Sequence, residues 1–200
     1  MRWPIPPLTS LAFLAILVAC SDDPAGPDDG LVFETSFEAG FDGFVTDGTD
    51  LDDPPIEWEI ERTDERADDG EWSVRLEIEN LNDAGKIWIE RRFELEPGLV
   101  YDVELSYALA SADFGDINTW TVIAGVTPTD PESADDLPFQ GSTANGADDD
   151  VGFVWLERSH DLTVTTGASG EAWLSLGVWG TSEFTRSYYL DDVRISFAPR

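Results

Sequence analysis

The chain of 200 residues contains one cysteine, one histidine and one lysine, and each scarcity excludes a class of protein. Because Cys20 has no second cysteine to pair with, no disulfide can hold the fold together. His160 has neither a second histidine nor a further cysteine for a zinc site, which argues against zinc-dependent hydrolysis. The sequence also lacks a glycine-rich phosphate loop and a dinucleotide-binding fingerprint, so nucleotide chemistry is not expected.

Basic residues are scarce as well, with 11 Lys and Arg against 42 Asp and Glu, and the formal net charge is −31. Such a charge repels phosphate backbones and anionic lipid surfaces, so nucleic acid is excluded as a partner. The acidity is typical of a protein from a high-salt habitat or of one that handles divalent cations. In the first case, screening salt would relieve the self-repulsion of the compact state.

The first twenty residues carry a basic start at Arg2, an apolar run over residues 8–18 and then Cys20. The run is too short for a permanent membrane span and has the layout of a secretion signal. It resembles the lipobox of bacterial lipoproteins, which implies that Cys20 is acylated and becomes the new N-terminus. The alternative is an ordinary signal peptide with a coincidental cysteine.

This resemblance predicts three parts: a signal peptide over 1–19, an acylated and flexible acidic tether over 20–30, and one folded domain over 31–200. Removal of the signal leaves 10 basic and 42 acidic side chains, a formal charge of −32. The membrane would then be reached through the acyl chains on Cys20 alone. An exported protein anchored in the outer membrane or at the cell surface is expected, rather than one in the inner membrane.

From residue 31 on, apolar residues alternate with polar ones and turn residues recur about every ten positions. This pattern predicts an all-β fold, a two-sheet antiparallel β-sandwich of the jelly-roll type. The expected strands are 31–37, 56–62, 72–79, 86–95, 100–110, 119–126, 151–157, 162–166, 172–179 and 188–197. Two long breaks, 47–55 and 128–150, interrupt the pattern, and the second is long enough to be functional or mobile.

Side-chain parity within the strands separates core positions from outer ones. In the last strand the parity changes at Asp191 and Asp192, which predicts a β-bulge there. A bulge turns one of the two acids inward. A buried carboxylate must be paired or bound to a cation.

Four motifs occur in order, and together they resemble the jelly-roll carbohydrate-binding modules of the family 4, 9 and 22 type, which have a galactose-binding-like fold. The motifs are Phe37-Glu38-Ala39-Gly40, Gly70, Pro97-Gly98-Leu99-Val100-Tyr101 and Tyr189-Leu190-Asp191-Asp192-Val193. Many members hold a structural calcium ion between the first and last strands. The resemblance therefore implies a calcium site formed by Glu38, Asp191 and Asp192, whose oxygens suit a hard cation. The alternative is that these acids cap turns or face solvent.

Three tryptophans are out of phase with the core pattern of their strands, namely Trp88, Trp173 and Trp179. An exposed platform of indole rings would stack on the ring faces of a sugar, while polar neighbours bond its hydroxyl groups. The neighbours of suitable parity are Glu90, Arg92 and Ser175. The alternative is that residues 128–150 or the N-terminal arm cover this face, which would make the indoles a second small core.

The remaining tryptophans are less informative. Trp120 and Trp155 can be assigned to either face of their strands, whereas Trp58 shares the parity of core positions.

Glu57, Glu59 and Glu61 share one face of a predicted strand and resemble the catalytic strand of family 16 glucanases. Paired carboxylates are what glycoside hydrolysis requires. However, the middle acid is Glu in place of Asp, and the chain is short for that enzyme, so an acidic outer face is the alternative. Ser159-His160-Asp161 cannot form a triad, because adjacent side chains in a strand point apart.

These observations predict a lipid-anchored, non-catalytic β-sandwich that binds polysaccharide. The alternative is a structural or protein-docking surface lipoprotein with the same fold and no glycan site, and a more remote one is a family 16-like hydrolase. The identity of the glycan does not follow from the sequence.

Overall fold

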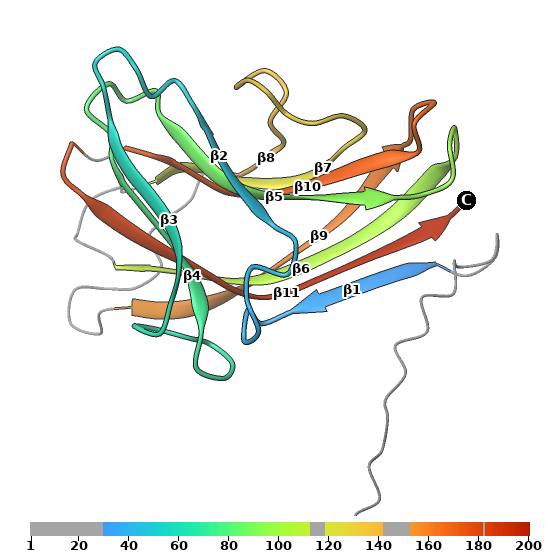
Figure 1. The fold of residues 1–200 in the computed structure, drawn as a ribbon, viewed down its shortest axis with the longest axis horizontal. Coiled ribbons are helices and arrows are strands. Elements are labelled where there is room, and N and C mark those ends of the chain that lie inside the picture. The colour runs from blue at the N-terminus through green and yellow to red at the C-terminus, as the bar shows by residue number, and fades with distance from the viewer. Residues whose placement is uncertain (1–29, 113–118, 142–152, 182) are drawn as a thin grey trace, which may run out of the picture.

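The computed structural model describes residues 30–112, 119–141, 153–181 and 183–200, which form an all-β fold (Figure 1). Cys20, the predicted signal peptide and nearly all of the predicted tether lie outside these residues. The described part contains no helix that is long and apolar enough to span a membrane. The strands are β1 (Leu31–Thr35), β2 (Val45–Thr49), β3 (Glu57–Thr63), β4 (Ser73–Glu79), β5 (Lys86–Glu94), β6 (Val100–Ala112), β7 (Thr119–Thr127), β8 (Phe139–Gln140), β9 (Phe153–Thr165), β10 (Glu171–Gly180) and β11 (Arg186–Pro199).

The strands form two antiparallel sheets that lie face to face as two layers (Figure 1). The six-stranded sheet has the order β3-β4-β11-β6-β9, and β1 pairs with the C-terminal half of β11. The five-stranded sheet has the order β2-β5-β10-β7-β8. Strands that are neighbours in a sheet are thus mostly distant in the sequence. The predicted two-sheet sandwich is confirmed.

Most strand ends lie within two residues of the prediction, and there are three larger differences. The two predicted strands 151–157 and 162–166 are one long strand, β9, because the polar residues between them continue the ladder with β6 instead of turning. The short strand β8 lies within the predicted break 128–150, and β2 overlaps the start of the predicted break 47–55. Their sequences are polar or very short, so only hydrogen bonding to β5 and β7 makes them strands.

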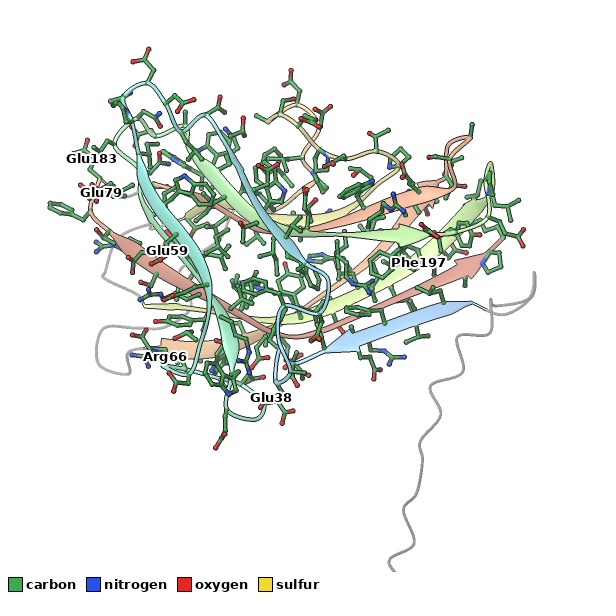
Figure 2. All side chains as sticks on the ribbon, viewed as in Figure 1. Glu38, Glu59, Arg66, Glu79, Glu183 and Phe197 are labelled. Carbon is green, nitrogen blue, oxygen red and sulfur yellow. The ribbon has the colours of Figure 1, made fainter. Side chains whose placement is uncertain are left out.

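The core lies between the two sheets and follows the predicted parity. Val74, Leu76 and Ile78 of β4 are almost fully buried, as are the alternating residues of β6 from Tyr101 to Leu109. Side chains fill the space between the layers, with Phe197 among them (Figure 2). The assignment of Trp58 to the core was wrong, because this residue lies on an edge strand and is 38% exposed.

The predicted β-bulge is present in β11. The register with β6 shifts between Asp191 and Arg194, and Asp192 has a φ angle of 51°, in the left-handed region. The extra residue turns Asp191 inward, and its side chain is fully buried.

Gly177 provides a test of how tightly β5 and β10 approach each other. A Cβ atom at this position would lie 2.2 Å from the carbonyl oxygen of Ile87 and 2.5 Å from the Cα atom of Trp88. We therefore expect Gly177→Ala to lower the free energy of unfolding by about 1–3 kcal/mol, measured by urea denaturation. The matched control is Gly167→Ala, because a Cβ atom there would meet nothing within 4 Å. Equal stability of the two variants would contradict this packing.

Candidate functional site

Trp88 does not belong to an exposed platform. Its side chain is fully buried and packs with Ile123 of β7 and Leu137 of the segment between β7 and β8. The predicted exposure was wrong because residues near 137 cover this part of the outer face of the five-stranded sheet. For Trp88, the alternative of a second small core is therefore confirmed.

Glu90 and Ser175 lie beneath the same cover and are not accessible as surface neighbours of a sugar. Glu90 is 4% exposed, and its Oε2 atom accepts a hydrogen bond of 2.7 Å from Nε1 of Trp88. Burial raises the pKa of Glu90 to about 7, and the nearby carboxyl groups of Asp130 and Asp47 act in the same direction. Ser175 stands opposite Glu90 in the ladder, and among the described residues its buried hydroxyl group has no hydrogen-bond partner.

Trp173 and Arg92 lie side by side farther along the same face. Trp173 is half-buried, and Arg92 is exposed and bonds Glu94 and Glu171. The Nε1 atom of Trp173 is buried and lacks a partner among the described residues. The structure thus separates these two residues from Trp179, which lies at the opposite end of β10.

Trp179 is the predicted platform residue that lies in an exposed aromatic group. Its ring centroid is 6.5 Å from that of Trp120 on β7 and 6.0 Å from that of Phe139 on β8. Trp120 is 48% exposed and Phe139 is 37% exposed. We call these three residues the aromatic surface. Sequence reasoning missed it because the parity of Trp120 was ambiguous and Phe139 lies in a segment without alternation.

Trp179 is held in place by polar contacts at its edge and over its ring. Its Nε1 atom donates a hydrogen bond of 2.7 Å to the carbonyl oxygen of Asp83. The ammonium group of Lys86 lies 4.4 Å from the ring centroid and forms a 2.7 Å ion pair with Asp50. These contacts fix the orientation of the indole ring.

The predicted cation ligands bind backbone amides of one loop, residues 64–72. Glu38 Oε1 accepts hydrogen bonds of 2.9 Å from the amides of Glu71 and Trp72, and Asp191 Oδ2 accepts bonds of 2.8 and 3.2 Å from those of Asp68 and Asp69. Burial raises the pKa of Asp191 to about 6, although these amide bonds oppose the change.

Among the described residues, no group of three or more His, Cys, Asp or Glu side chains is arranged to hold a metal ion. Asp192 is exposed. Glu38 and Asp191 therefore act as caps of the loop in this structure, and calcium binding stays a prediction.

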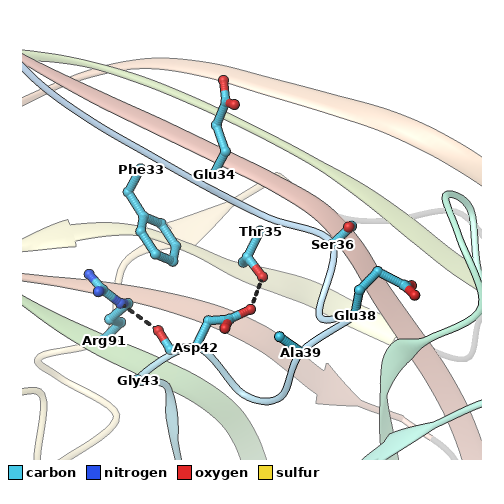
Figure 3. Close-up of a pocket in the computed structure, with 9 residues that line it drawn as sticks. All are labelled: Phe33, Glu34, Thr35, Ser36, Glu38, Ala39, Asp42, Gly43 and Arg91. Carbon is cyan, nitrogen blue, oxygen red and sulfur yellow. Dashed lines mark hydrogen bonds between the residues drawn. The ribbon is translucent and has the colours of Figure 1, made fainter. Parts of the chain in front are cut away.

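Glu38 is one of the residues that line a surface pocket of about 550 Å³ beside β1 (Figure 3). Arg91 of β5 packs its guanidinium group 3.9 Å from the ring centroid of Phe33 and donates a 2.9 Å hydrogen bond to the carbonyl oxygen of Asp42. The carboxylate of Asp42 accepts a hydrogen bond from the hydroxyl group of Thr35. These contacts fix the loop between β1 and β2, from which Glu38 reaches residues 70–72.

Glu57, Glu59 and Glu61 share the outer face of β3, as predicted. Glu57 and Glu59 face acids of β4, because they pair with Glu79 and Glu77 in the ladder, whereas Glu61 pairs with Arg75. Arg75 of β4 forms ion pairs with Glu59 and Glu61 at 3.3 and 2.5 Å. One guanidinium group therefore offsets part of the repulsion on this acidic face.

No protein-family model matches the chain, and no curated protein matches it by sequence. Solved structures do share its fold. The CBM22-1 xylan-binding domain of Xyn10C from Paenibacillus barcinonensis matches over 88% of this chain and 99% of its own, with a TM-score of 0.50 and 14% identity.

Two further solved structures match over similar lengths. The C-terminal family 22 carbohydrate-binding module of Xyn10B from Clostridium thermocellum matches over 83% of this chain and 92% of its own, with a TM-score of 0.52 and 13% identity. The K1 cleaved adhesin domain of Lys-gingipain from Porphyromonas gingivalis matches over 82% and 97%, with a TM-score of 0.53 and 14% identity. The chain thus has the β-sandwich fold of carbohydrate-binding modules, which an adhesin domain also has.

The raised pKa of Glu90 makes stability depend on pH. The native protein holds this proton more tightly than the unfolded chain, where the ordinary value is 4.5. The stabilising contribution of the proton is therefore complete below the ordinary pKa and is lost as pH rises to about 7. We expect the stability of Glu90→Gln, relative to the original chain, to rise by about 1–3 kcal/mol between about pH 5 and pH 8.

Urea denaturation of both proteins at fixed ionic strength measures this difference. Glu132→Gln is the control, because Glu132 is exposed and lies between β7 and β8, in the segment that covers Trp88 and Glu90. A difference between Glu90→Gln and the original chain that does not change with pH would show that Glu90 titrates normally.

Proposed function

We propose that this chain is a non-catalytic, glycan-binding β-sandwich that is displayed from a membrane. The observation that carries the proposal is the aromatic surface of Trp120, Phe139 and Trp179, where three rings from three strands meet at one end of the outer face. Flat, partly exposed rings offer the apolar surface on which a sugar ring stacks.

The charge of the chain favours a neutral glycan over an acidic one. With 42 acidic residues, the protein repels polyuronates and sulfated polysaccharides. Lys86, the only lysine, is 4% exposed and already paired with Asp50, so it leaves little positive charge to attract an anionic ligand. Binding through ring stacking and hydroxyl contacts would persist at high salt, unlike binding through ion pairs.

The fold supports the same proposal. The solved structures that share it include domains described as xylan-binding and a carbohydrate-binding module studied for ligand binding. Because an adhesin domain shares the same fold, a protein-docking role is the alternative if no glycan binds. A structural calcium ion held by Glu38, Asp191 and Asp192 remains part of the proposal.

The aromatic surface can be tested by substitution. We expect the double variant Trp120→Ala/Trp179→Ala to lose at least about tenfold in affinity for the polysaccharide that retards the original chain, because tryptophan contacts of this kind contribute about 1–2 kcal/mol or more. The measurement is affinity electrophoresis through gels cast with neutral and acidic polysaccharides.

The matched control is Trp58→Ala, which removes another partly exposed indole on an edge strand of the other sheet. Equal loss in the control would contradict a specific role of the aromatic surface. Uniform migration of the folded original chain through every gel would favour protein docking.

Membrane display depends on Cys20, which lies outside the described residues. When the full chain is expressed in bacteria fed an alkyne-labelled fatty acid, we expect the label on the original chain and its loss in Cys20→Ser. The membrane fraction should contain the first protein and lack the second. Equal labelling of both would end the lipoprotein proposal.

A further inference from the structure

A covering segment crosses the outer face of the five-stranded sheet and carries part of the aromatic surface. We call residues 128–140 the strap; it is the yellow loop that leads from β7 to β8 in Figure 1. Leu137 packs on Trp88 and Ile123, and the carbonyl oxygen of Pro138 accepts a 2.9 Å hydrogen bond from the amide of Ala124. Phe139 follows directly, opposite Ile123 in the ladder with β7.

A buried carboxyl group faces the strap from the sheet. Glu90 is 4% exposed and accepts the 2.7 Å hydrogen bond from Trp88, and its protonated carboxyl group donates a hydrogen bond to the side chain of Asp130 in the strap. The carboxyl group of Asp47 approaches from β2, where Asp47 pairs with Trp88. Ser175 faces Glu90 from β10.

In the described part of the chain, no basic side chain forms an ion pair with Glu90, Asp130 or Asp47 that would offset their negative charge. The charged groups that act on Glu90 are Asp130 and Asp47, and both are acidic. Lys86 and Arg92 flank Glu90 on β5, but Lys86 pairs with Asp50 while Arg92 pairs with Glu94 and Glu171. Carboxyl groups in hydrogen-bonding contact cannot both ionise without strong repulsion, so one of them carries a proton.

We propose that the proton shared by Glu90 and Asp130 latches the strap onto the sheet and thereby controls glycan binding at the aromatic surface. With the proton in place, the strap is closed and Phe139 stands beside Trp179. When the proton leaves, two carboxylates repel each other beneath the strap, which loosens, exposes Trp88 and displaces Phe139. The control of binding rests on the proposed function, whereas the latch itself does not.

The pH range of the latch follows from its surroundings. Burial and the neighbouring acids raise the pKa of Glu90 from 4.5 to about 7, so the latch loosens progressively as pH rises between these values and is weakest above the higher one. Asp47, whose pKa burial also raises, adds to the repulsion once it is ionised.

Hydrogen exchange of the strap amides in the full chain, divided by the intrinsic rates, measures the latch. Between about pH 5 and pH 7 we expect protection of residues 128–140 to fall at least about tenfold, since each pH unit between the ordinary pKa of 4.5 and the raised value of about 7 favours opening by up to tenfold. Glu90→Gln keeps the hydrogen-bonding shape without the charge and should show constant protection. Asp130→Asn serves the same purpose if Glu90→Gln fails to fold.

The control variant is Glu132→Gln, which removes an exposed charge of the strap and should keep the fall in protection. Constant protection in the original chain, or a fall that persists in both Glu90→Gln and Asp130→Asn, would overturn the latch.

A second measurement separates the latch from the proposed function. Affinity electrophoresis at the same two pH values should show weaker glycan binding at the higher pH in the original chain and no change in Glu90→Gln. If the strap opens and glycan binding stays constant, the control of binding is overturned. If the strap opens and no polysaccharide binds at either pH, the latch is supported and the proposed function fails.

Discussion

The apolar contact between the two sheets is the interaction on which the rest of the structure depends. Phe93 of the five-stranded sheet packs against Phe33 and Phe197 of the six-stranded sheet, with ring centroids 5.6 and 5.1 Å apart. The chain has a single cysteine, so no disulfide assists this contact. Burial of aromatic and aliphatic side chains must therefore outweigh the mutual repulsion of 42 acidic residues.

The acids that do become buried are accommodated in two different ways. Asp191 is fully buried, but three backbone amides, those of Asp68, Asp69 and Asp192, donate hydrogen bonds to it. Such bonds favour the ionised form and fix the loop that donates them. Glu90 instead receives one indole hydrogen bond, and its burial together with the neighbouring acids favours its neutral form. The amides thus offset part of the cost of burying the Asp191 carboxylate, whereas nothing comparable favours the ionised form of Glu90.

The outer face of the five-stranded sheet is divided by the strap into covered and open parts. Under the strap, Trp88 and Glu90 are withdrawn from solvent, and beyond it Trp120, Phe139 and Trp179 are partly exposed. Because Phe139 belongs to the strap, the same segment both closes one part of the face and completes the other. Contacts that hold the strap therefore also set the geometry of the aromatic surface.

Alternation of apolar and polar residues made the fold class, most strands, the core of β4 and β6 and the bulge at Asp191 predictable, because side chains in a strand alternate between two faces. The same rule identified Trp88 and Trp179 as outer-face residues. It did not tell which of them is exposed.

That distinction depends on the path of the strap, which has no periodicity and is placed by its contacts with Ala124, Ile123 and Trp88. The order of the strands is likewise set by pairing between segments far apart in the chain, and it alone brings Trp120 and Phe139 next to Trp179. The sequence by itself thus determined which face of each strand is apolar, because that is a local property. Only the tertiary structure decided what covers the opposite face, because that depends on long-range contacts.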